Sequence, residues 1–125
     1  HAILRGAVNK HGNAIPNYHY EDLQLLLEKY NERDLKNPAV IVDANHSNSN
    51  KQFKEQIRIV KEVLHSRSLS EDIHNLVKGV MIESYLVEGN QKIGCADHVY
   101  GKSITDPCLG WEDSERLIHT IADMC

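Results

Sequence analysis

Residues 38–46 read PAVIVDANH, and this stretch decides the fold. Residues 39–42 are small or β-branched, a composition typical of a strand that is buried on both faces, as in parallel sheets. Pro38 precedes the run, and polar side chains follow it directly. The stretch therefore predicts a buried parallel strand over 39–43 with polar groups at its carboxyl end.

The segment before this strand predicts a further strand and a helix. Residues 2–5, AILR, form a short apolar run that ends at Gly6, and Gly12 and Pro16 exclude a continuous helix or strand in the loop that follows. Residues 21–33 then place apolar side chains at i, i+3, i+4 and i+7, with acids early and bases late, as in an amphipathic helix. These apolar side chains are Leu23, Leu26, Leu27 and Tyr30.

The segment after the central strand predicts two helices and then a third strand. A serine or asparagine can cap a helix over about 49–65, in which apolar residues recur at helical spacing. Residues 70–76 predict a short helical turn capped by a serine, and residues 80–83, VMIE, predict a third strand. The apolar positions of the longer helix are Phe53, Ile57, Val60 and Leu64.

The last part of the chain predicts a loop, a strand and a helix. Residues 88–102 have little periodicity and three glycines, which indicates a long loop. Residues 103–105 predict a short fourth strand, and a helix is expected to start at Glu112 or Asp113. Its expected buried stripe consists of Leu117, Ile118, Ile121 and Ala122.

Four strands that alternate with helices predict an α/β fold of parallel (β/α) units with right-handed crossovers. In such folds, whether barrel or open sheet, ligands bind at the carboxyl ends of the strands, where the loops converge. Four chemically capable residues fall at or just after these ends: Arg5, His46, Glu83 and Asp106.

Composition narrows the function classes. Hydrophobic residues make up 41% and charged residues 26% of the chain, close to the average for a globular domain. A formal charge of −4 and a pI near 6.0 give no basic footprint for nucleic acid, and no apolar stretch approaches the roughly 20 residues that span a bilayer. Three cysteines without a CxxC pair suit a reducing compartment. We therefore expect a cytoplasmic protein that binds neither nucleic acid nor membrane.

His46, Glu83 and Asp106 form a donor set that suits a divalent metal. One imidazole and two carboxylates favour Mn²⁺, Fe²⁺, Co²⁺ or Zn²⁺ and leave positions open for water or substrate. The three residues are far apart in the sequence and match no local metal motif, so a site depends on the fold. The alternative is that His46 caps a loop while the two carboxylates make ordinary hydrogen bonds.

Arg5, Asp43 and Lys102 are further candidates. Arg5 beside Gly6 offers a planar fork for a phosphate, or else it forms a surface ion pair. Asp43 lies in the buried run, where a carboxylate needs a partner, so it either binds the metal or orients His46 or a lysine. Lys102 either supports this site by binding an anion or is a solvated loop lysine.

Four segments together resemble the C-terminal half of class I 3-deoxy-D-arabino-heptulosonate 7-phosphate (DAHP) synthase. The resemblance covers nearly the whole chain, and its motifs are long and in the same order. The first segment reads ILRGA where the family usually has ILRGG, and DANHSNS stands where the family has DFSHANS; the arginine and the histidine are kept. The segments are HAILRG (1–6), DANHSNSNKQF (43–53), GVMIESYLVEGNQ (79–91) and YGKSITDPCLGWED (100–113).

The resemblance implies a metal-dependent transferase. The family has a TIM-type (β/α)8 barrel and condenses phosphoenolpyruvate with erythrose 4-phosphate, releasing phosphate, in the shikimate pathway to the aromatic amino acids. The resemblance implies that His46, Glu83 and Asp106 are metal ligands and that Arg5 binds the phosphate of phosphoenolpyruvate. Residues 1–125 would form a C-terminal half-barrel, about four strands and their helices.

The resemblance also implies missing parts. The family's fourth metal ligand is a cysteine in the N-terminal half of the barrel, and neither Cys95 nor Cys108 matches it, so we expect the chain alone to be inactive. A half-barrel has two open sheet edges and an apolar inner face, so we expect it to bind the N-terminal half or further copies of itself. A non-catalytic metal-binding half-barrel module and a small open-sheet metal-dependent hydrolase stay open as alternatives.

Overall fold

The protein is an α/β structure built on a three-stranded parallel sheet with strand order β1–β4–β5. The computed structural model describes residues 1–125. In register, Ile41 of the central strand lies between Ile3 and Gly79. The β-branched run therefore forms the middle strand, as its composition predicts. The strands are β1 Ala2–Leu4, β4 Val40–Asp43 and β5 Val77–Met81.

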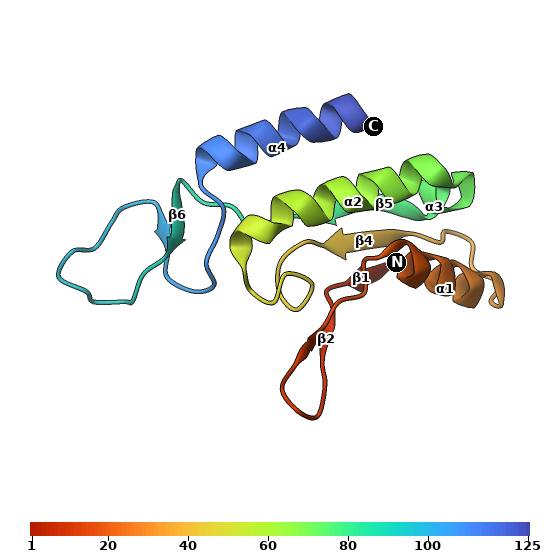
Figure 1. Cartoon of the computed structure of the whole chain (residues 1–125), viewed down its shortest axis with the longest axis horizontal. Helices are drawn as coiled ribbons and strands as arrows, with labels where there is room; N and C mark the ends of the chain where they lie inside the picture. Colours follow the sequence, from red (N-terminus) through yellow and green to blue (C-terminus); the bar gives the residue numbers. More distant parts are fainter.

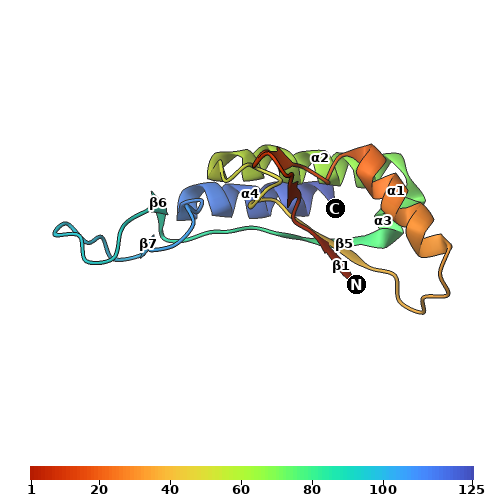
Figure 2. The same cartoon turned by 90° about the horizontal axis from the view of Figure 1, so that it is seen from below.

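The helices lie on one side of this sheet (Figure 2). In Figure 1, α2 and α4 run alongside each other above the strands, and the two helices are in contact. None of the helices combines the length and the apolar composition needed to span a membrane. The helices are α1 Tyr20–Asn31, a 3-10 turn η1 Phe53–Glu55, α2 Gln56–Leu69, α3 Glu71–Leu76 and α4 Trp111–Met124.

The hydrophobic core lies between the sheet and these helices. Val40 and Val42 point from β4 toward the helices and are fully buried. Leu23 of α1 and Leu117 of α4 close the core from its two sides. The largest contribution comes from α2, whose core residues are Ile59, Val60, Val63 and Leu64.

The opposite face of the sheet is bare. Ile3 is 45% exposed and Met81 is 39% exposed, although both lie in strands. A Cβ added to Gly79 would meet no atom within 4 Å. The sheet thus has one helix-covered face and one open apolar face, an arrangement consistent with part of a (β/α) barrel.

Two small two-stranded arms extend from the sheet (Figure 1). The first is an antiparallel hairpin between Gly6 and Asn17, and the second is a parallel pair that follows β5. The strands of the first arm are β2 Ala7–Val8 and β3 Ala14–Ile15, and those of the second are β6 Val87–Asn90 and β7 Lys102–Ser103.

Most of the predicted elements are confirmed within a few residues. The strands over 2–5 and 39–43 are present as β1 and β4, and the helix over 21–33 is present as α1. Ser70 caps α3 by accepting a hydrogen bond from the backbone N–H of Ile73. The predicted α/β class of parallel units is therefore confirmed.

The predicted fourth strand over 103–105 is wrong. Only Ser103 belongs to a strand there, and that strand pairs with β6 instead of β5. The Ser103 hydroxyl accepts from the N–H of Thr105 and donates to the carbonyl of Asp106, which bends the chain. The segment that follows β5 is paired later in the chain, where Leu109 N donates to Glu83 O at 3.0 Å. The predicted loop over 88–102 also contains most of β6.

Two predicted element boundaries are also wrong. The second helix begins at Gln56, because His46, Asn50 and Lys51 have positive φ and hold the preceding residues in a tight loop. Non-glycine residues rarely adopt this conformation, and it cannot continue into a helix. β5 begins before the predicted position, at Val77.

The apolar stripe of α4 is rotated relative to the predicted one. Leu117 is buried and Ile121 is half-buried, as expected, but Ile118 is 56% exposed and Ala122 is also exposed. Ser114 takes the remaining core-facing position through a 2.6 Å contact between its hydroxyl and that of Ser84. A polar side chain therefore occupies part of the face of the helix that packs inward.

Gly6→Ala should destabilise the protein far more than Gly12→Ala. Both glycines have positive φ, 73° and 82°, so alanine costs about 1–2 kcal/mol of backbone strain at either position. A Cβ at position 6 would also lie 2.8 Å from the Cβ of Ser47, whereas one at position 12 would meet nothing within 4 Å. We expect an extra loss of about 1–3 kcal/mol for Gly6→Ala in urea unfolding. Equal losses would contradict this close approach.

Candidate metal centre

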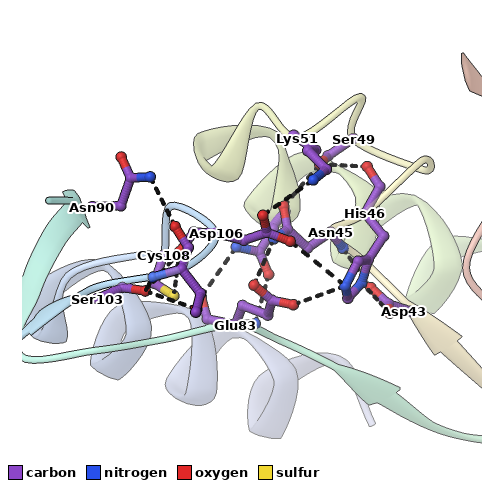
Figure 3. A network of polar contacts seen from close by, with 12 residues as sticks. Asp43, Asn45, His46, Ser49, Lys51, Glu83, Asn90, Ser103, Asp106 and Cys108 are labelled. Carbon is purple, nitrogen blue, oxygen red and sulfur yellow. Dashed lines mark hydrogen bonds and ion pairs between the residues drawn. The ribbon is translucent and has the colours of Figure 1, made fainter. Parts of the chain in front are cut away.

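Three side chains from separate segments meet beyond the carboxyl ends of β4 and β5 (Figure 3). His46 follows β4, Glu83 follows β5, and Asp106 precedes the residues that pair beside Glu83. The Nε2 atom of His46 lies 3.2 Å from Glu83 Oε1 and 3.9 Å from Asp106 Oδ2. One donor atom from each residue lies within 4.8 Å of the other two. The fold thus brings together the three residues that the sequence singles out.

Asp43 orients the His46 ring. Its Oδ2 lies 2.7 Å from His46 Nδ1, and its Oδ1 accepts a hydrogen bond from the backbone N–H of Asn45. The Asp43 side chain is only 2% exposed, so the carboxylate has little room to move. A carboxylate on one ring nitrogen leaves the other nitrogen free for a metal, as is usual for metal-binding histidines. Nε2 accordingly faces Glu83.

Gln56 holds the backbone of Glu83, and Asn45 holds its carboxylate. The fully buried Gln56 side chain donates to the Glu83 carbonyl at 3.1 Å and accepts from the Glu83 N–H at 2.8 Å. Asn45 Nδ2 donates to Glu83 Oε2 at 2.9 Å, and the Ser49 hydroxyl donates to the side-chain oxygen Oδ1 of Asn45. Neither support could be recognised from the sequence, because a glutamine on a helix and an asparagine in a loop look like ordinary polar residues.

Asn48 ties together the ends of the first two parallel strands. Its side-chain amide donates to the carbonyls of Leu4 and Asp43, at 3.0 and 2.8 Å, and its oxygen accepts from the N–H of Asn17. Asn48 is 5% exposed. The sequence signal for this role of Asn48 was the run of polar residues in DANHSNSN. Buried side-chain amides in such a loop normally form hydrogen bonds with backbone groups.

Asp106 is held less firmly than the other two residues. Its carboxylate is 34% exposed, and Lys51 Nζ lies 3.1 Å from its Oδ1. The Cys108 thiol donates to the Asp106 carbonyl at 3.4 Å, and burial raises the pKa of that thiol. Cys108 lies beside the three-residue cluster and is not one of its donors.

Arg5 and Lys102 are not part of the cluster. The exposed Arg5 guanidinium makes no hydrogen bond or ion pair, so the alternative of a surface ion pair is not observed. The Arg5 backbone carbonyl accepts from the N–H of Ser47. Lys102 lies in β7 with its side chain over Gly89, and its ammonium group has no polar partner. Both cations remain free to meet an anion.

The sequence model of the DAHP synthetase I family matches residues 3–119. The chain belongs to this family. It is 42% identical over 125 residues to the phospho-2-dehydro-3-deoxyheptonate aldolase of Haemophilus influenzae. It is 40% identical over 125 residues to the Phe-sensitive aldolase of Escherichia coli K12 and 39% identical over 126 residues to the Trp-sensitive one. Each of these matches covers 98% of this chain.

A solved structure of a DAHP synthase has the same fold as this chain over nearly all of its length. The structure of phospho-2-dehydro-3-deoxyheptonate aldolase from Francisella tularensis SCHU S4 superposes on 98% of this chain with a TM-score of 0.83 at 33% identity. The chain corresponds to 33% of that protein and to 32–33% of the three relatives above. It therefore spans about one third of the length of the DAHP synthases that it matches.

The donor atoms in this chain fit a divalent metal. DAHP synthases are generally metal-dependent, and this chain offers one imidazole nitrogen and two carboxylate oxygens in a half-buried position. Such a mixed nitrogen and oxygen set suits first-row transition metals, and three ligands leave further coordination positions open. The cluster is therefore a possible metal site of this family.

Gln56→Ala should unfold at a lower urea concentration than the unmodified chain. The change leaves the N–H of Glu83 without a partner and removes one of the two hydrogen bonds to its carbonyl, which keeps the bond from Leu109 N–H, at a cost of about 1–3 kcal/mol. Gln52→Ala is the matched control, because Gln52 is exposed and its side chain makes no capping bond; a loss within about 0.5 kcal/mol is expected there. Similar losses for the two variants would show that the Gln56 bonds do not stabilise the fold.

Proposed function

We propose that residues 1–125 form the C-terminal half-barrel of a DAHP synthase domain, which condenses phosphoenolpyruvate with erythrose 4-phosphate and releases phosphate. Family membership supports this transferase activity for the parent protein. The observation that carries the proposal for this chain is the convergence of His46, Glu83 and Asp106 within 4.8 Å of one another. Cytoplasm is the compartment that we propose for this step of aromatic amino acid synthesis.

We propose that His46, Glu83 and Asp106 hold a divalent ion, which would be Mn²⁺, Fe²⁺, Co²⁺ or Zn²⁺. When bound, such an ion supplies a Lewis acid and a template for an oxygen of the substrate. Asp43 keeps Nε2 of His46 directed at the site, and Asn45 keeps one Glu83 oxygen turned away from the ring nitrogen. These contacts fix the ligands before a substrate arrives, which lowers the cost of ordering them.

Arg5 is our candidate for the phosphate of phosphoenolpyruvate. It lies at the carboxyl end of β1, beside the end of β4, and its guanidinium is exposed and without a partner in this chain. A guanidinium can make two parallel charge-assisted hydrogen bonds to a phosphate. Lys102 is a second candidate for an anionic group, supported by its unpaired ammonium on the arm that follows β5.

The alternative function is a metal-binding half-barrel module without catalysis. The bare face of the sheet, with Ile3 and Met81 exposed, favours a partner in either case, because both faces of a parallel sheet are normally covered. We propose the N-terminal half of the barrel as that partner and a second copy of the chain as its substitute.

Glu83→Gln should weaken Co²⁺ binding by at least about tenfold, since it removes a ligand charge while keeping the shape of the side chain. Asp43→Asn should weaken binding by about tenfold through the His46 ring. Visible absorption of added Co²⁺ measures both affinities. Glu88→Gln is the control, because Glu88 pairs with Lys54 instead of joining the cluster. Equal affinities in all of these variants would contradict the proposed site.

Phosphate release should require both halves of the barrel. The chain, Mn²⁺, phosphoenolpyruvate and erythrose 4-phosphate are expected to give no phosphate until a separately expressed N-terminal half is added. Light scattering at micromolar concentration should show the chain alone to be larger than a monomer. Activity of the chain alone would contradict the need for a second half. A folded, metal-binding mixture without activity would favour the non-catalytic module.

A further inference from the structure

Lys51 is the one cation that contacts the three-residue cluster. Its Nζ lies 3.1 Å from Asp106 Oδ1, and no other charged side chain approaches that oxygen as closely. In Figure 3 the lysine reaches over from the loop that also carries His46. The backbone N–H of Lys51 donates to the His46 carbonyl at 2.9 Å, and its φ is 60°. A tight turn therefore links the position of this ammonium group to that of a proposed metal ligand.

The two oxygens of Asp106 face different side chains. Oδ1 faces Lys51, whereas Oδ2 is the oxygen nearer to His46 Nε2, at 3.9 Å. An ion held by His46, Glu83 and Asp106 would therefore share the Asp106 carboxylate with Lys51. Two positive charges on one carboxylate repel each other, and each weakens the attraction of the carboxylate for the other.

We propose that Lys51 competes with the metal ion for Asp106 and so sets the affinity of the site. This inference rests on the proposed metal site. The lysine side chain is 63% exposed, so its ammonium group can move into solvent when an ion binds. His46 and Glu83 are held by buried partners and have no such freedom. Asp106 is the ligand at which the exchange of cations takes place.

The release of Lys51 from Asp106 would also create a binding position for an anion. A lysine released from Asp106 stays on the same loop as His46 and carries a free positive charge beside the site. Metal binding would thus expose an ammonium group at the rim, where a phosphate or carboxylate group of a substrate could meet it.

The first test measures Co²⁺ affinity. Lys51→Met should bind Co²⁺ about threefold to tenfold more tightly than the unmodified chain, because the competing charge is gone. Lys51→Arg should bind as the unmodified chain does. Lys54→Met is a matched control: Lys54 is 61% exposed and lies 3.0 Å from Glu88, so it loses a similar ion pair away from the cluster and should leave the affinity unchanged.

The second test needs no variant. Acetylation of lysines by a dilute reagent, read by mass spectrometry, should label Lys51 at least about twofold faster after Mn²⁺ is added, while labelling of Lys54 stays constant. An unchanged affinity in Lys51→Met, or a weaker one, would overturn the proposal, since a weaker one would mean that the lysine positions Asp106. If the unmodified chain binds no metal at all, the proposed site itself fails.

Discussion

Beyond the ends of the parallel strands, buried side-chain amides make the hydrogen bonds to the backbone that a neighbouring strand would otherwise make. The positions of the site residues depend on these bonds. Gln56 satisfies both backbone groups of Glu83, and Asn48 satisfies the carbonyls of Leu4 and Asp43. A buried backbone group without a partner costs about as much as a lost hydrogen bond. The two amides therefore stabilise the strand ends and place the side chains that follow them.

The cluster shows a gradient of rigidity as a result. His46 is fixed through the buried Asp43, and Glu83 is fixed through both its backbone and its carboxylate. Asp106 comes from a bend shaped by a serine hydroxyl, and its carboxylate contacts an exposed lysine. In the proposed metal site, two rigid side chains would hold a cation in place while the third adjusts.

The elements that follow from periodicity could be predicted from the sequence, and those that follow from side-chain contacts could not. The β-branched run gave β4, and the spacing of Leu23, Leu26, Leu27 and Tyr30 gave α1. The bend after Ser103 replaced a predicted strand because one hydroxyl satisfies two backbone groups nearby. His46 and Glu83 could be chosen by their positions after strands, and Asp106 was chosen after a predicted strand that is a bend in the structure. The roles of Gln56 and Asn48 depend on distances that only the folded chain has.

The bare face of the sheet connects stability to function. Ile3 and Met81 remain exposed there, and the chain spans about one third of the length of its relatives. Burying apolar side chains such as these is worth about 25 cal/mol per Å² of surface, so whatever covers this face stabilises the sheet. The proposed metal site lies at the carboxyl edge of the same sheet, and we propose that the segment that covers the face also reaches the site. In our proposal, the active site is therefore completed when the barrel folds, and the three donor residues alone do not form a catalytic site.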